Sequence, residues 1–135
     1  MKFINIATLA LEELFAPWGS EIGSMVDIHG VGVLIRGDSG IGKSESILAL
    51  IERGYSLVSD DMTRVTLVDG REVVGTSSDL TRNHMEIRGI GIVNVAAMFG
   101  AKSVRLEKRV DLIITPSFGY MEPTLKVAAE FPNVR

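Results

Sequence analysis

The feature that most constrains this chain is a glycine-rich octapeptide set between an apolar segment and an amphipathic one. Residues 37–44 read Gly-Asp-Ser-Gly-Ile-Gly-Lys-Ser, which is a complete P-loop pattern. The octapeptide directly follows residues 31–35, a predicted strand, and it leads into residues 43–53, whose apolar side chains recur at helical spacing. A strand, this loop and a helix in that order predict an α/β domain that binds phosphate groups where the helix begins.

The residue types of the octapeptide suit the tail of a nucleotide triphosphate. Backbone N–H groups can surround the phosphates only where no side chain intrudes, and the three glycines provide that access. The lysine would supply a cation for the β- and γ-phosphates, and the final serine a hydroxyl ligand for Mg²⁺. The alternative is a glycine-rich turn that only joins strand to helix. The predicted nucleotide-binding residues are Gly37, Asp38, Ser39, Gly40, Ile41, Gly42, Lys43 and Ser44.

Composition narrows the class of protein. The chain has 135 residues, of which 46% are hydrophobic and 23% charged, and this balance predicts one globular domain with a core. A net charge of -3 gives no support for binding nucleic acid. The absence of cysteine excludes disulfides, thiolate zinc sites and thiol nucleophiles. No secretory signal and no apolar run of roughly 20 residues is present, so we expect no membrane span and a cytoplasmic location.

The remaining pattern predicts a mixed sheet with few helices. Residues 18–24 look like a turn-rich stretch, and His29-Gly30 like a tight turn or bulge between two strands. Gly54 is expected to cap the helix after the P-loop, and Asp69-Gly70 is a strong hairpin signal. We expect helices over residues 9–15, 43–53 and 122–131. We expect strands over residues 25–28, 31–35, 55–59, 63–68, 71–74, 85–95 (kinked at its glycines) and 110–115.

An acidic pair, Asp60-Asp61, ends the strand that follows the P-loop helix. If that strand runs parallel to residues 31–35, its carboxyl end lies beside the phosphates. A carboxylate there can hold Mg²⁺ or accept the proton of an attacking hydroxyl. Neighbouring side chains on a strand point to opposite faces, so one aspartate should face the γ-phosphate more directly, and the sequence leaves open which. The alternative is a solvated turn that opens the hairpin.

Other polar residues carry weaker signals. Glu86 lies in Met-Glu-Ile-Arg-Gly and, taken alone, can be a surface residue that pairs with Arg88. His29 and His84 lie in no recognisable triad or metal-ligand spacing, so both are expected to be turn or surface residues.

Taken together, three segments resemble the bacterial HPr kinase/phosphorylases in residues and in spacing: residues 32–45, 50–61 and 86–92. The resemblance implies a P-loop fold related to phosphoenolpyruvate carboxykinase, assembled as a hexamer. It implies an ATP- and Mg²⁺-dependent kinase that phosphorylates a serine of HPr, a phosphocarrier of the sugar phosphotransferase system, and so acts in carbon catabolite regulation. Members of the family also reverse the reaction by phosphorolysis. By resemblance, Lys43 is the P-loop lysine, Ser44 and Glu86 ligate Mg²⁺, and the Asp60-Asp61 pair activates the serine hydroxyl.

The chain departs from the family pattern in three places. Ile22 occupies the position of a histidine linked to phosphate chemistry, and isoleucine cannot exchange a proton, which favours the forward reaction over phosphorolysis. The family's amino-terminal domain has no counterpart here. Residues 116–120 resemble the start of the family's closing helices, so a section with the active-site loop is expected to be missing between Thr115 and Pro116. We therefore expect one catalytic domain over residues 1–135.

Two other functions fit the same motifs. One is a nucleotide-binding regulatory module that has lost catalysis, which the isoleucine and the missing section would explain. The other is a kinase of the same fold with another acceptor.

Overall fold

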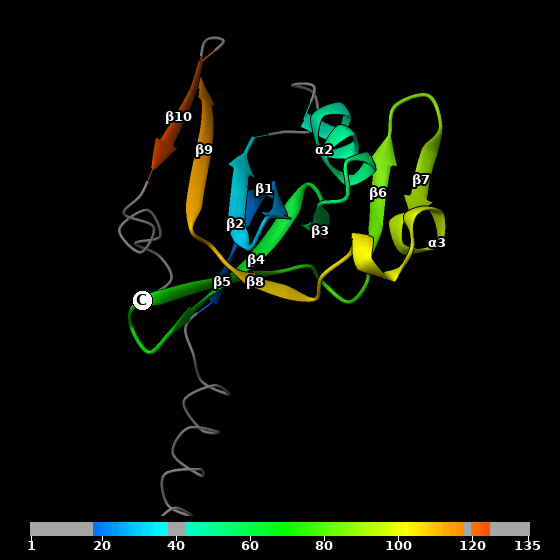
Figure 1. Cartoon of the computed structure of the whole chain (residues 1–135). Helices are drawn as coiled ribbons and strands as arrows, with labels where there is room; N and C mark the ends of the chain where they lie inside the picture. The colour runs from blue at the N-terminus through cyan, green and yellow to red at the C-terminus, as the bar shows by residue number, and fades with distance from the viewer. Residues whose placement is uncertain (1–17, 38–42, 118–119, 125–135) are drawn as a thin grey trace, which may run out of the picture.

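A mixed sheet with one main helix on it forms the body of the protein (Figure 1). The computed structural model describes residues 18–37, 43–117 and 120–124. The eight-stranded sheet has the order β10-β9-β2-β1-β4-β5-β8, and β3 pairs with β1 beside this path. Its strands are β1 (Trp18–Ile28), β2 (Val31–Arg36), β3 (Ser56–Ser59), β4 (Met62–Val68), β5 (Glu72–Thr76), β8 (Glu107–Arg109), β9 (Leu112–Ser117) and β10 (Tyr120–Thr124).

The pairing of the strands confirms the expectation of a mixed sheet. β2 and β9 are parallel, with Leu34 opposite Ile113, and the other pairs that the structure describes are antiparallel. β1 is antiparallel to both β2 and β3, so β3 runs in the same direction as β2. The carboxyl ends of β2 and β3 therefore lie at the same edge of the sheet.

The prediction for residues 18–24 was wrong, because this stretch is the first half of β1. Trp18 to Ile22 pair with β4, and the strand then continues along β2 from Gly23 onward. Two glycines and three polar residues hide the alternation that usually reveals a strand. The pairing comes from β4, at least 40 positions along the chain, so local sequence does not reveal it.

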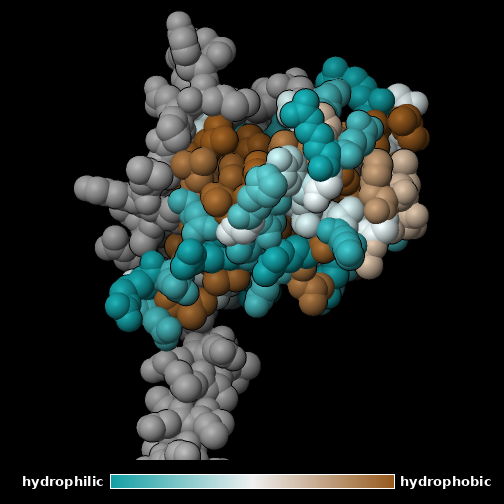
Figure 2. Space-filling view, in the orientation of Figure 1, coloured by the Kyte–Doolittle hydropathy of each residue, from teal (hydrophilic) through white to brown (hydrophobic). Residues whose placement is uncertain are grey.

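Two apolar clusters stabilise the sheet from its two faces. Successive β2 residues alternate between them: Leu34 joins one cluster, while Val33 and Ile35 join the other. The second cluster contains Ile47 and Ile51 from the helix α2 (Lys43–Glu52), which covers this face. The partly buried Leu112 and Ile114 of β9 also pack against this second cluster. Figure 2 shows apolar side chains gathered at the surface over β2 and β9.

Two predicted turns are confirmed with the expected chemistry. After α2, Gly54 has φ +99°, and the N–H of Tyr55 donates to the carbonyl of Leu50 at 3.1 Å, as in a glycine C-cap. Between β4 and β5, Asp69 and Gly70 both have positive φ, the signature of a tight hairpin turn.

The structure corrects two further predictions. Residues 85–95 form no single kinked strand: β6 (His84–Ile87) turns back into β7 (Gly91–Asn94), and Val95 begins the short helix α3 (Val95–Phe99), which Asn94 caps. Gly89 and Gly91 adopt positive φ at this turn. Toward the other end of the sequence, residues 116–117 and 120–124 are strand rather than helix, since β10 pairs antiparallel with β9. β9 runs through Thr115 and Pro116 without interruption.

Two predicted helices lie wholly or partly outside the described residues. The helix expected over residues 9–15 and the later part of the one expected over 122–131 lie outside the described residues. In the part of the chain that the structure describes, no helix has the length and apolarity to cross a membrane.

Candidate active site

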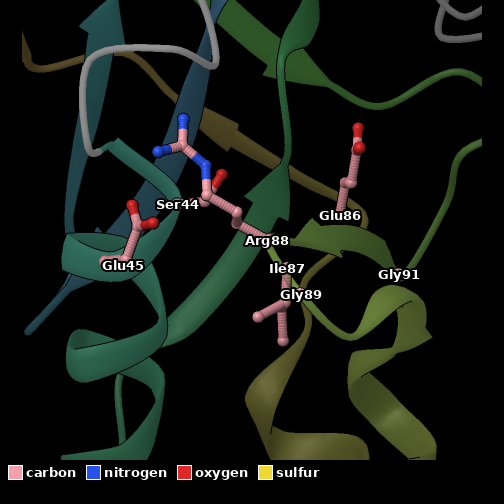
Figure 3. Close-up of a pocket in the computed structure, with 7 residues that line it drawn as sticks. All are labelled: Ser44, Glu45, Glu86, Ile87, Arg88, Gly89 and Gly91. Atoms are coloured by element: carbon pink, nitrogen blue, oxygen red, sulfur yellow. The ribbon is translucent and has the colours of Figure 1, made fainter.

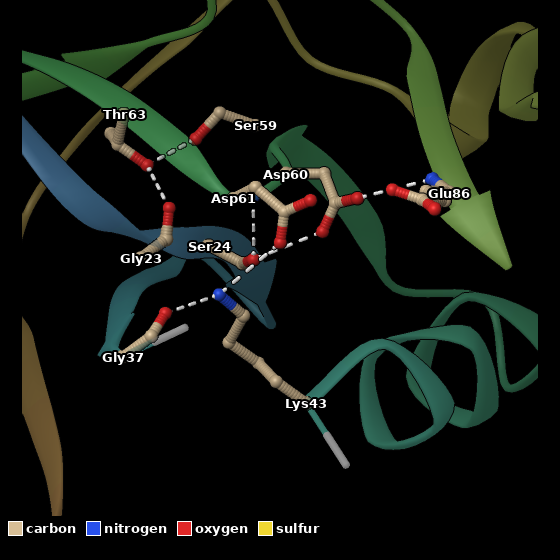
Figure 4. Close-up of polar contacts among 9 residues, drawn as sticks. All are labelled: Gly23, Ser24, Gly37, Lys43, Ser59, Asp60, Asp61, Thr63 and Glu86. Atoms are coloured by element: carbon tan, nitrogen blue, oxygen red, sulfur yellow. Dashed lines mark hydrogen bonds and ion pairs between the residues drawn. The ribbon is translucent and has the colours of Figure 1, made fainter. Parts of the chain in front are cut away.

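Lys43 bridges the two ends of the phosphate-binding loop. β2 leads to Gly37, and α2 begins at Lys43. The lysine is 3% exposed, and its Nζ donates to the Gly37 carbonyl oxygen at 2.6 Å (Figure 4). The ammonium group is therefore held beside Gly37, the first residue of the octapeptide. The remaining loop residues lie outside the described part, and their predicted roles stay predictions: Asp38, Ser39, Gly40, Ile41 and Gly42.

The acidic pair lies beside this lysine, as the sequence predicted. Because β3 runs in the same direction as β2, Asp60 and Asp61 emerge at the edge where α2 begins. Oδ1 of Asp61 lies 3.5 Å from Nζ of Lys43. The same oxygen is buried and accepts no hydrogen bond within the described chain, so it has a free lone pair. The two strand ends thus bring a cation and a carboxylate together.

Asp61 occupies a strained turn. Its φ is +60°, and the N–H of Met62 donates to the carbonyl of Asp60 at 2.7 Å, which closes a three-residue γ-turn. Such a conformation costs about 1–3 kcal/mol and persists only where the surroundings impose it. Here β1 imposes it: Gly23 N–H donates to the Asp61 carbonyl at 2.8 Å, and Asp61 N–H donates to Ser24 Oγ at 3.0 Å.

The middle of β1 also contacts Gly37, the first residue of the P-loop octapeptide. The carbonyl of Ile22 accepts a hydrogen bond from Gly37 N–H at 3.1 Å. Gly23 cannot carry a side chain, since a Cβ there would lie 2.6 Å from the carbonyl oxygen of Ile35. The Ile22 side chain is 56% exposed and pairs across the sheet with Met62. Residues 22–24 therefore join Gly37 to the acidic pair through the backbone of Ile22 and Gly23 and the hydroxyl of Ser24.

Both carboxylate oxygens of Asp60 accept hydrogen bonds. Its Oδ1 accepts a hydrogen bond from Ser24 Oγ at 3.0 Å, and its Oδ2 accepts one from the Glu86 N–H at 3.2 Å. Burial raises the pKa of Asp60 above its ordinary value, with a further contribution from the charge of Asp61, while the Ser24 and Glu86 hydrogen bonds and Lys43 act in the opposite direction. A raised pKa makes the ionised carboxylate a stronger base.

A pocket of about 260 Å³ lies between α2 and the β6–β7 hairpin (Figure 3). The predicted metal ligands Ser44 and Glu86 both line it, although they are 42 positions apart in the sequence. Arg88 forms no ion pair with Glu86 in the described chain. It lines the same pocket, and Figure 3 shows its side chain extending toward Ser44. The other lining residues are Glu45, Ile87, Gly89 and Gly91.

Ser44 and Glu86 suit a Mg²⁺ ion that is bound together with a nucleotide. The described residues contain no group of three acidic, histidine or cysteine side chains able to enclose a metal ion. Mg²⁺ bound with a nucleotide usually takes one or two protein oxygens, and phosphates and water complete its shell. A hydroxyl from Ser44 on α2 and a carboxylate from Glu86 on β6, which line the same pocket, match that need.

Sequence reasoning missed two functional residues, Gly23 and Ser24. Both lie in the stretch that was predicted to be turn-rich. Their partners are Asp60, Asp61 and the backbone of β2, which are distant in sequence. No local signal marks them, because a glycine and a serine before a strand are common in any loop.

Comparisons with known proteins agree with this geometry. The family model of the HPr Serine kinase C-terminal domain matches residues 13–118. The chain belongs to this family. The resemblance read from the three sequence segments is thereby confirmed.

Relatives of the HPr serine kinase family cover most of this chain. It is 44% identical over 113 residues to the HPr kinase/phosphorylase of Leptospira biflexa, covering 84% of this chain and 35% of the relative. It is 50% identical over 104 residues to the HPr kinase/phosphorylase of Bacillus cereus, covering 77% of this chain and 34% of the relative. The solved HPr(Ser) kinase/phosphatase from Coxiella burnetii superposes with a TM-score of 0.69 at 30% identity, covering 78% and 82% of the two chains. The chain thus spans about a third of the length of the curated relatives.

Proposed function

We propose that this chain is the catalytic part of an ATP- and Mg²⁺-dependent protein-serine kinase whose acceptor is HPr. The observation that carries the proposal is the 3.5 Å contact between Nζ of Lys43 and Oδ1 of Asp61, at the edge of the sheet where β2 and β3 end and α2 begins. Relatives named HPr kinase/phosphorylase support the acceptor. We extend to this chain the family's kinship with phosphoenolpyruvate carboxykinase, its hexameric assembly and its cytoplasmic location.

The residues divide the reaction between them. Lys43 neutralises charge on the β- and γ-phosphates, and backbone N–H groups of the loop hold their oxygens. Ser44 and Glu86 would hold Mg²⁺, which supplies charge stabilisation to the phosphates. A carboxylate of the acidic pair accepts the proton of the acceptor serine as its oxygen bonds to the γ-phosphorus and the bond to ADP breaks.

We assign the role of base to Asp61. The raised pKa favours Asp60, but a base must first reach the acceptor oxygen beside the γ-phosphate, and its basicity matters only after that. Asp61 lies next to Lys43, the residue proposed to bind the β- and γ-phosphates. One oxygen of its carboxylate is buried and accepts no hydrogen bond within the described chain. Both oxygens of Asp60 already accept hydrogen bonds from Ser24 and Glu86. Asp60 accordingly positions the pair and the β6 strand.

The direct test is transfer of labelled γ-phosphate from ATP to purified HPr, with the labelled residue identified by mass spectrometry. We expect Mg²⁺-dependent label on a serine. If the chain binds ATP and labels no serine of HPr, the proposed acceptor is wrong; if no acceptor is labelled at all, the chain is a nucleotide-binding module. Label on a different protein identifies a kinase of another specificity.

Ile22 predicts a bias between the two directions of the reaction. Its exposed side chain cannot donate or accept a proton. We therefore expect transfer of the phosphoryl group from seryl-phosphorylated HPr to inorganic phosphate, which forms pyrophosphate, to be slower than the forward transfer from ATP. Ile22→His should raise phosphorolysis, since the backbone contact from residue 22 to Gly37 is unchanged. Ile22→Val is the matched control. Equal phosphorolysis in all three proteins would contradict the role of this position.

Glu86→Gln tests the metal assignment. Removing the charge should raise the Mg²⁺ concentration needed for tight ATP binding at least about tenfold, the lower end of what even an outer-shell change costs a metal site. The N–H of residue 86 still donates to Asp60, so the acidic pair keeps its support. Calorimetry of ATP binding at several Mg²⁺ concentrations measures the effect, with the exposed Glu52→Gln as control. An unchanged Mg²⁺ dependence would remove Glu86 from the ligand set.

A further inference from the structure

One buried hydroxyl, that of Ser24, touches both members of the acidic pair. Ser24 lies on β1 with none of its surface exposed. Its Oγ donates to Oδ1 of Asp60 at 3.0 Å and accepts from the backbone N–H of Asp61 at 3.0 Å (Figure 4). A single side chain therefore holds one aspartate by its carboxylate and the other by its backbone.

The two hydrogen bonds fix each other's direction. An N–H can only donate, so the Asp61 amide occupies a lone pair of the Ser24 oxygen. An ionised carboxylate can only accept, so the Ser24 proton must point at Asp60. The order of donation thus runs from the Asp61 amide through the Ser24 hydroxyl to the Asp60 carboxylate, and rotation of the hydroxyl away from either partner would leave a buried polar group unpaired.

The Asp61 contact has a second consequence. The positive φ of Asp61 needs partners that outweigh its strain, and Ser24 supplies one of the two that β1 provides. The other is the N–H of Gly23, which is bound to the Asp61 carbonyl. Without the hydroxyl, the Asp61 amide loses its acceptor, and the turn can relax and carry the carboxylate away from Lys43.

The geometry points to Ser24 as a positioning residue that sets the relative placement of Asp60 and Asp61 for phosphoryl transfer. This inference rests on the proposed kinase function and deepens it. Among the described residues, the hydroxyl of Ser24 hydrogen-bonds to Asp60 and Asp61 and not to the side chain of Lys43 or Glu86. It acts through the two aspartates, so its removal should slow the chemical step and leave ATP binding in place.

Ser59 offers a matched control for the same substitution. It is also a buried serine, 2% exposed, and directly precedes the acidic pair. Its hydroxyl hydrogen-bonds to that of Thr63, which donates to the Gly23 carbonyl, and neither contact reaches a carboxylate. A loss shared by Ser24→Ala and Ser59→Ala would therefore report a general packing defect near β3.

The kinetic test compares Ser24→Ala, Ser24→Thr and Ser59→Ala in the whole chain with HPr as acceptor. For Ser24→Ala we expect kcat to fall about 10–100-fold, as for loss of an outer-shell partner, with the KM for ATP changed less than about threefold. Ser24→Thr keeps the hydroxyl and should recover most of the rate, and Ser59→Ala should stay close to the unmodified protein. Equal rates for Ser24→Ala and the unmodified protein, or a pure KM effect, would overturn the inference.

A second measurement separates this inference from the proposed function. Hydrogen exchange of the Asp61 amide, followed by NMR, should be slow in the unmodified protein and in Ser59→Ala, and faster in Ser24→Ala. Failure to label HPr would overturn the acceptor and leave this readout intact. Unchanged protection of the Asp61 amide in Ser24→Ala would overturn the role of Ser24, whatever the acceptor.

Discussion

Replacing Lys43 by alanine is expected to reduce phosphoryl transfer by about 10³-fold or more and to weaken ATP binding. Loss of a single preorganised donor to transition-state charge typically costs about 10²–10³-fold in kcat. Lys43 carries a full charge, and it also holds Gly37 and faces Asp61, so its removal affects the loop and the base together. Transfer to HPr and calorimetry of ATP binding measure the two effects.

The lysine stem is buried, so the alanine variant alone could fail through lost packing. Lys43→Met keeps a stem of similar length without the charge and should lose transfer to the same extent while its thermal unfolding stays close to that of the unmodified protein. Lys102→Ala removes an exposed lysine outside the site and should have no effect on transfer. Transfer retained by Lys43→Met would show that the ammonium group is not part of the phosphate site.

Asp61→Asn is expected to slow transfer by about 10²–10⁴-fold, the usual contribution of a general base, with ATP affinity little changed. This substitution suits the site because asparagine tolerates positive φ better than most residues, so the strained turn should persist. The amide keeps the size of the carboxylate and lacks its basicity. Single-turnover kinetics with saturating ATP isolates the chemical step.

Asp60→Asn provides the comparison that decides between the two aspartates. It also should slow transfer, since Asp60 receives the Ser24 and Glu86 hydrogen bonds that order the pair, but by a smaller factor than Asp61→Asn. A larger loss in Asp60→Asn would exchange the two roles and would agree with the raised pKa of Asp60. Rates equal to the unmodified protein in both variants would remove the pair from the role of base.

Local signals predicted the elements that depend on neighbouring residues. The helix after the P-loop, its glycine cap at Gly54 and the Asp69-Gly70 turn are short-range features, and the structure has all of them. The sequence placed Asp60-Asp61 beside the P-loop on the condition that two strands run in the same direction, and the structure meets that condition. Family segments gave Ser44 and Glu86 as a pair, and both line one pocket, although their role as metal ligands stays a prediction.

Predictions failed where a strand is recognised only through its pairing partner. In the stretch 18–24, residues 18–22 pair with β4, at least 40 positions along the chain, whereas residues 120–124 pair with β9, which ends three positions before them. In the segment 85–95, the glycines are compatible with either a kinked strand or a turn between two strands. The structure has the turn, with β6 paired to β7 and packed against the core through Met85 and Ile87.

The sequence by itself determined that an octapeptide with the P-loop pattern stands between a strand and a helix, because spacing along the chain defines that motif. It also determined that an acidic pair ends the next strand. Only the tertiary structure decided how these parts work together: which aspartate faces Lys43, why Asp61 holds a strained turn, and that Ser24 ties the pair to β1. These contacts join β1, β2 and β3 side by side, and their energies depend on distances that exist only once the sheet has formed.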